Sequence, residues 1–152
     1  MSLPSPRQTH TIQDYCQAHR IKLTKNRQLV LDALFDSKQA VSAYELVNQI
    51  ESQYHKKIPV MTVYRVLEFL QQHHLVHKIS SMNKYIACSS AICKAAVPQF
   101  LVCQKCNLVQ EVSIDQQLFG TLEEQVRNAG FHLQGAQMEL SCICHQCRGL
   151  EN

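Results

Sequence analysis

The sequence lacks any long hydrophobic run, and this absence argues against a membrane-spanning protein. No apolar stretch approaches the ~20 residues that a transmembrane helix needs. Residues 1–11 also lack the apolar core of a secretory signal. We therefore expect a cytoplasmic protein without a membrane partner. In such a reducing compartment, the eight cysteines are better explained as metal ligands, redox thiols or core residues than as disulfides.

Charged residues are also scarce, at 18% against 45% hydrophobic residues, and this balance excludes a disordered chain. The 152 residues suffice for one ordinary domain or two small ones. Residues 1–86 carry eleven Lys and Arg against six Asp and Glu, whereas residues 87–152 carry four against six. Seven of the eight cysteines lie from Cys88 onward. This asymmetry indicates an anion-binding module followed by a metal-binding one.

The basic half carries apolar residues at helical spacing in four segments, which are 12–19, 27–35, 43–50 and 63–70. Thr24 is a plausible N-cap, Ser42 and Glu45 match a capping box, and Thr62 is expected to open the fourth helix. Residues 75–79 and 84–88 then alternate as two strands around a polar turn. Helices followed by a hairpin predict a winged helix-turn-helix DNA-binding domain over residues 1–86.

Arg65 lies almost opposite the apolar stripe of the fourth predicted helix, on an outward face that it shares with Met61, Glu68 and Gln72. An arginine there is suited to bidentate contact with guanine in the major groove. The alternative is an ordinary solvated arginine on an amphipathic helix.

Two Cys-x-x-Cys pairs, Cys103 with Cys106 and Cys144 with Cys147, predict one closed tetrahedral zinc site. The residues between the pairs predict a strand at 109–113, a helix opened by Ser113 and Gln116, and a strand at 137–143. We therefore expect an α+β fold, in which residues 100–152 form a small zinc-clipped α/β domain after a hinge at 87–99.

Two alternatives concern these cysteines. A catalytic dithiol would sit at a helix N-terminus. Residues 100–103 instead predict a strand that leads into the first pair, and no tryptophan accompanies either pair. Cys142 could replace Cys144 in the second pair. However, Cys142 lies on the same face of the predicted strand as Met138 and Leu140, which favours a buried strand residue over a ligand.

Several segments together resemble the ferric-uptake-regulator (Fur) superfamily of repressors. They are the recognition-helix sequence TVYRVLEFL at 62–70, KLTKNR at 22–27, where Lys25 replaces a family proline, and the two cysteine pairs. Residues 42–44 and 76–88 are most similar to the zinc-uptake-regulator (Zur) branch.

The resemblance implies a homodimeric, non-enzymatic transcriptional repressor with no small organic substrate. It would bind double-stranded operators of metal-uptake genes when zinc is plentiful. Arg65 and Tyr44 would contact bases, with Tyr64 as a further candidate. The structural zinc would be held by the two cysteine pairs.

The resemblance also implies a second, regulatory zinc in each subunit. Its family ligands match His77, Cys88 and Glu111, but the linker histidine of the family is missing, and Cys93 is the one soft ligand in residues 89–99. A thiolate favours zinc over harder ions. The competing hypotheses are an iron or manganese sensor and a peroxide or thiol sensor that uses Cys88, Cys93 and Cys142.

Overall fold

The computed structural model describes residues 6–37, 39–88 and 97–149. The chain divides into two compact units, Met1–Ile92 and Cys93–Asn152. Within the described residues, every helix is too short or too polar to cross a bilayer. Each unit has its own sheet.

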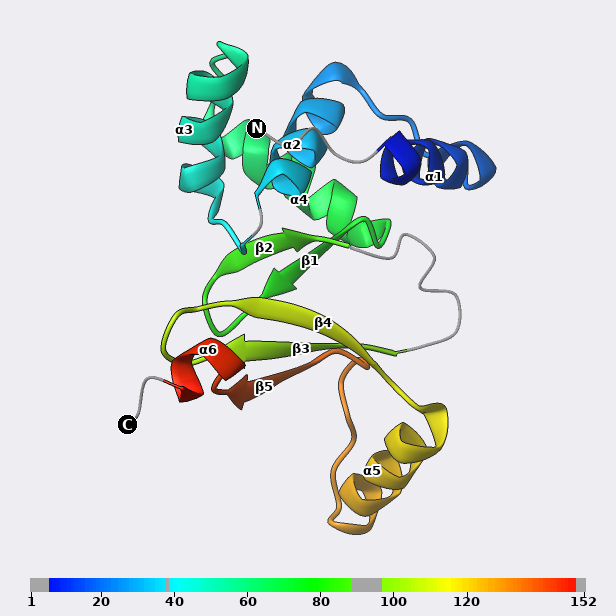
Figure 1. Cartoon of the computed structure of the whole chain (residues 1–152). Helices are drawn as coiled ribbons and strands as arrows, with labels where there is room; N and C mark the ends of the chain where they lie inside the picture. The colour runs from blue at the N-terminus through cyan, green and yellow to red at the C-terminus, as the bar shows by residue number, and fades with distance from the viewer. Residues whose placement is uncertain (1–5, 38, 89–96, 150–152) are drawn as a thin grey trace. The chain divides into compact units, whose positions relative to one another are not determined.

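The first unit consists of four helices and a hairpin, with the helices on one side of the hairpin in Figure 1. Its elements are α1 (Pro6–Ala18), α2 (Lys25–Asp36), α3 (Ala43–Tyr54), α4 (Val60–Gln72), β1 (Val76–Ile79) and β2 (Lys84–Ala87). The strands are antiparallel, with His77 opposite Ile86, and Val41 forms an isolated bridge to Tyr85. This order confirms the predicted winged helix-turn-helix.

Helices α2, α3 and α4 bury one apolar stripe each, because their apolar residues recur at helical spacing. The largest fully buried side chains of these helices are Val30, Leu31, Leu34, Leu46, Ile50, Val63, Leu67 and Leu70. Arg27 of α2 lies over the Phe69 ring of α4, at 3.4 Å from guanidinium carbon to ring centroid. The packing of these stripes sets which side of α4 faces outward.

Local capping explains two of the helix starts. The Thr24 hydroxyl accepts a hydrogen bond from the Arg27 N–H, and Ser42 with Glu45 forms a complete capping box. The predicted start at Thr62 is wrong, because α4 already begins at Val60 after Pro59. The helix has no side-chain cap, and its first hydrogen bonds run from the Thr62 and Val63 N–H groups to the Pro59 carbonyl, at 2.9 and 3.2 Å.

The second unit contains a three-stranded mixed sheet in the order β4-β3-β5. Its elements are β3 (Val97–Cys103), β4 (Val109–Ile114), α5 (Gln116–Asn128), β5 (Met138–Cys142) and the short α6 (His145–Arg148). Strand β3 runs antiparallel to β4 and parallel to β5. The expected α+β fold is therefore confirmed. The predicted cap at Ser113 is wrong, because Ser113 lies in β4 and the Asp115 carboxylate caps α5 through the Gln117 N–H.

The second unit has a thin core. Phe100 and Gln99 of β3 are fully buried, and the Gln99 side chain bonds the Ala136 carbonyl at 2.8 Å and the Met138 N–H at 2.7 Å. These bonds replace the water that a buried amide would lose, and they fix the segment leading into β5. Figure 1 shows α5 beyond the end of the sheet, and no side chain of α5 is buried.

We expect Ser42→Ala to lower the free energy of unfolding of the first unit by about 1 kcal/mol. The Glu45 N–H would lose its acceptor, and Glu45 also joins α3 to β2 through a 3.1 Å ion pair with Lys84. Denaturant unfolding monitored by helical circular dichroism measures the change. Ser52→Ala, on the exposed surface of the same helix, is the control and should change stability by less than ~0.5 kcal/mol. Equal effects of the two substitutions would contradict a capping role for Ser42.

Candidate metal centre and DNA-binding face

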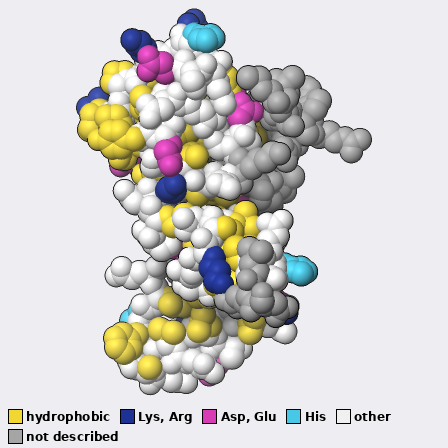
Figure 2. Space-filling view, turned by 60° about the vertical axis from the view of Figure 1, so that its left-hand side comes forward, with side chains coloured by type: hydrophobic (Ala, Val, Ile, Leu, Met, Phe, Trp, Pro, Cys, Tyr) yellow, Lys and Arg dark blue, Asp and Glu magenta, His cyan; other side chains and the backbone are white. Residues whose placement is uncertain are grey.

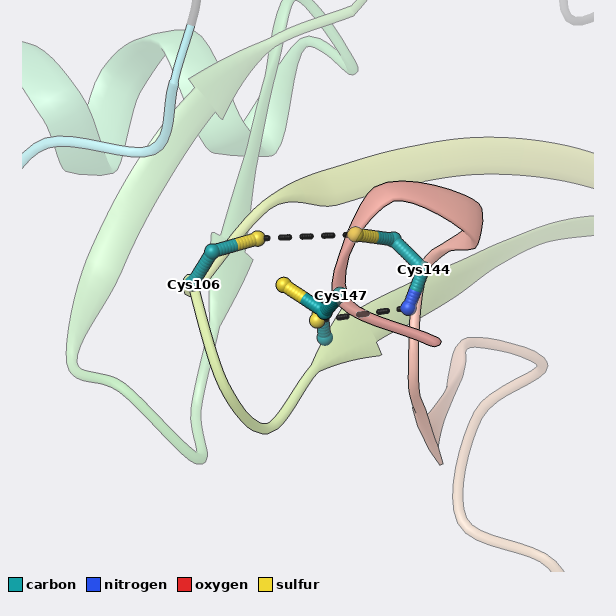
Figure 3. A group of neighbouring side chains, drawn as sticks. Cys106, Cys144 and Cys147 are labelled. Carbon is teal, nitrogen blue, oxygen red and sulfur yellow. Dashed lines mark hydrogen bonds between the residues drawn. The ribbon is translucent and has the colours of Figure 1, made fainter. Parts of the chain in front are cut away.

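Four cysteine thiols of the second unit converge where its first and last segments meet. Cys103 ends β3, and Cys106 follows in a tight turn closed by a hydrogen bond from the Asn107 N–H to the Cys103 carbonyl. Asn107 has a φ of +61°, which asparagine tolerates better than most residues. Cys144 precedes α6 and Cys147 lies within it, and Figure 3 shows the three labelled thiols turned toward one another.

The geometry of these thiols fits one tetrahedral metal ion. All four Sγ atoms lie within 4.8 Å of one another, and the Cys106 and Cys144 sulfurs are 3.7 Å apart. Four zinc–sulfur bonds of about 2.3 Å place tetrahedral sulfurs about 3.8 Å apart. A zinc ion would be held by Cys103, Cys106, Cys144 and Cys147, and it would clip the C-terminal segment to the end of β3.

The proton affinities of the thiols follow from their neighbours. Backbone N–H groups of Cys106 and Cys144 lower the pKa of Cys103 to about 6, and the Cys144 N–H lies 3.3 Å from its sulfur. Hydrogen bonding with the Cys144 thiol and burial raise the pKa of Cys147 to about 12. Without a cation, the four thiols cannot all ionise at neutral pH. A bound divalent ion reverses this balance, since it binds thiolates.

The two alternatives for these cysteines have different outcomes. Cys142 lies in β5, paired with Cys103 in the parallel register, and the four-thiol group contains Cys144 in its place. The first pair follows a strand and a turn and not a helix N-terminus. The second pair does lie at a helix N-terminus, since Cys144 precedes α6. The convergence of all four thiols in one group nevertheless favours a structural metal site over a catalytic dithiol.

His77 and Cys88 come together in the first unit. The Cys88 N–H bonds the carbonyl of Leu75, the residue before β1, and His77 lies two residues farther along, within β1. Both side chains are buried, and their ligand atoms lie within 4.8 Å of each other. Glu111 lies in β4 of the second unit, opposite Phe100. Cys93 lies outside the described residues.

The outward face of α4 carries the predicted base-reading residue. Arg65 and Glu68 are exposed, whereas Val63 and Leu67 on the opposite side are buried. Tyr44 of α3 is 64% exposed, and its ring meets that of Tyr64 edge-on at 6.5 Å. The three predicted DNA-contacting residues therefore lie in one region of the first unit.

A groove runs beside this helix. It is lined by Met61, Tyr64, Arg65, Glu68, Gln71, Lys78 and Tyr85. Sequence reasoning missed Lys78 and Tyr85, which belong to the hairpin. In the sequence, the only signal was the strand pattern in which Lys78 precedes Ile79 and Tyr85 precedes Ile86. That pattern predicts a hairpin, but it does not predict which helix the hairpin packs beside.

The model of the ferric uptake regulator family matches residues 18–141, a span that includes α2 to α5, the hairpin and the first cysteine pair. The chain belongs to the ferric uptake regulator family. It is 30% identical to the zinc uptake regulation protein of Escherichia coli over 90% of this chain and 78% of that protein. It is 28% identical to the ferric uptake regulation protein of Bacillus subtilis over 86% and 87% of the two chains.

A solved structure of a zinc uptake regulator complexed with zinc and DNA is also similar. The TM-score is 0.82 at 25% identity, over 97% of this chain and 98% of that one. The recognised relatives are transcription regulators, and the fold expected from the Fur resemblance is confirmed.

Substituting Cys147→Ser in this Fur-family chain should remove metal and unfold much of the second unit. The substitution removes one of the four thiolate ligands, and with it the link that holds the C-terminal segment to the metal site. Elemental analysis of the purified protein and proteolysis of residues 97–149 measure the two effects. Cys142→Ser is the matched control and should retain metal. Loss of metal from Cys142→Ser with retention by Cys144→Ser would establish the alternative ligand set.

Proposed function

We propose that this Fur-family protein is a zinc-responsive transcriptional repressor that binds operators of metal-uptake genes as a dimer. The observation that carries the proposal is the pairing of His77 with the Cys88 thiol in the hairpin of a winged-helix unit. Imidazole and thiolate together favour zinc over harder ions. The similarity to zinc uptake regulators, one of them solved with zinc and DNA, supports the same metal and the same target.

The first unit supplies the DNA contacts. Arg65 would bind a guanine through two parallel hydrogen bonds, and Tyr44 and Tyr64 would contact neighbouring bases or phosphates. The excess of positive charge in residues 1–86 supports attraction to the phosphate backbone. Hydrogen bonds to base edges would then select the operator.

The second unit supplies the dimer contacts. Leu118 and Phe131 are 63% and 69% exposed, and Figure 2 shows hydrophobic side chains at the surface around α5. An amphipathic helix without a buried side chain needs a partner surface. A second copy of this unit would cover it and place two first units on a two-fold operator.

The regulatory zinc would be held by His77, Cys88 and Glu111, with Cys93 as the fourth ligand. These residues belong to both units, so a zinc ion bound to all of them would limit the relative movement of the units. Zinc would then favour the arrangement that binds DNA, and operator would raise the affinity for zinc by the same factor. With the four-cysteine site, each subunit would hold two zinc ions.

Metal analysis and DNA titration test this function. The purified protein should contain zinc, and added zinc should tighten its binding to duplexes that it selects from a random pool. Iron or manganese replacing zinc in this response would support the corresponding sensor. Reduced, metal-free protein that binds as tightly as zinc-loaded protein would support a thiol sensor and contradict the proposal.

Arg65→Ala should abolish preference for the selected duplex over random DNA while dimerisation and zinc content stay unchanged. Each lost bidentate contact costs about 1–3 kcal/mol, and a dimer loses two. Fluorescence anisotropy with both duplexes measures the preference. Arg65→Lys keeps the charge but not the planar fork, so it should retain random-DNA binding and lose the preference. Undiminished preference in Arg65→Ala would exclude Arg65 as the base reader.

Cys88→Ser and His77→Ala should each abolish the zinc response of DNA binding while the structural zinc remains. Cys93→Ser decides the fourth ligand. A lost response assigns Cys93, whereas an unchanged response indicates three protein ligands and a water, which zinc accepts. Titration of DNA binding against buffered zinc measures each case. If Cys88→Ser and His77→Ala both responded normally, the proposed regulatory site would be wrong.

A further inference from the structure

Met61 is a large apolar side chain on the solvent side of α4. It is 60% exposed, whereas Val63, Val66, Leu67 and Leu70 of the same helix are buried. It is the second residue of α4, and it lies one helical turn before Arg65. Its position therefore belongs to the outward face and contributes nothing to the core of the first unit.

Three chemically different side chains follow one another along this face. Met61 is apolar, Arg65 is a hydrogen-bond donor and Glu68 is an acceptor, at spacings of four and three residues. All three line the groove beside α4. A face built only to bind phosphates would carry donors or cations and would exclude a carboxylate. This face instead carries an apolar group, a donor and an acceptor, which match the methyl, acceptor and donor groups that bases present in the major groove.

The partners of these groups follow from the groove chemistry of B-DNA. Guanine presents two acceptors, cytosine presents a donor amino group, and thymine presents a methyl group. In helix-turn-helix proteins, the N-terminal residues of the recognition helix contact base edges. Met61 occupies that end of α4, and its flexible thioether chain adapts to apolar surfaces. A thymine methyl group is the apolar feature that it would meet in the groove.

We propose that Met61 packs against the 5-methyl group of a thymine and thereby selects a T·A pair near the guanine read by Arg65. This proposal rests on the proposed DNA-binding function. Four helical residues span about 6 Å, and successive bases of one strand are about 3.4 Å apart. The thymine should therefore lie within about two base pairs of the guanine in each half-site.

The test uses duplexes that the zinc-loaded wild-type protein selects from a random pool. Each thymine of the selected half-site is replaced in turn by uracil, which keeps the base pairing and removes only the methyl group. The lost burial of one methyl group corresponds to roughly fourfold weaker binding for one half-site and roughly fifteenfold for both. Met61→Ala should bind the thymine and uracil duplexes equally. Gln72→Ala, on the same face at the far end of α4, should keep the wild-type difference.

The outcomes separate the two proposals. A wild-type protein that selects a motif and loses it on Arg65→Ala, yet tolerates uracil at every thymine, overturns only the assignment of Met61. A uracil effect of unchanged size in Met61→Ala also overturns it, because another side chain then contacts the methyl group. A wild-type protein that selects no motif overturns the DNA-reading function together with this inference.

Discussion

Burial of one stripe of α4 is the constraint on which the rest of the first unit depends. Val63, Leu67 and Leu70 are fully buried, so rotation of the helix would expose them at a cost of roughly 2 kcal/mol each. The orientation of α4 that keeps these side chains buried also holds Arg65 on the outward side. The helix also leads directly into the hairpin, where Leu75 is bonded back to the Leu70 carbonyl. The position of His77 and Cys88 therefore follows from the packing that orients the DNA-binding face.

The second unit is organised by its thiols as much as by its core. Phe100 and Gln99 anchor β3, but no side chain of α5 is more than partly buried. The N–H groups that lower the pKa of Cys103 prepare one thiolate, and the raised pKa of Cys147 keeps another protonated. Four thiols within 4.8 Å of one another are complementary to one divalent ion. The four converging thiols and the exposed apolar side chains around α5 are the two features of this unit that an ion and a partner surface would satisfy.

The parts of the site that could be predicted from the sequence were those that depend only on residues close together in the chain. Each Cys-x-x-Cys pair sits on a local turn, and the four-cysteine group that they predicted is assembled in the structure. Tyr44 and Tyr64, separated by twenty residues, meet only because α3 packs against α4. Lys78 and Tyr85 could not be placed in the groove, since the path of the hairpin beside α4 is a matter of tertiary packing.

The sequence by itself determined α1 to α5, the hairpin and most of the sheet, because periodicity and capping act within a few residues, whereas the short α6 was not predicted. Thr24 and the Ser42–Glu45 pair marked helix starts correctly. The starts of α4 and α5 were misplaced, because α4 begins after Pro59 without a side-chain cap and Asp115, two residues beyond Ser113, caps α5. Only the tertiary structure decided that Cys144, and not Cys142, joins the other three thiols. That choice depends on where β5 ends against β3, and strand pairing is a contact between residues about forty positions apart.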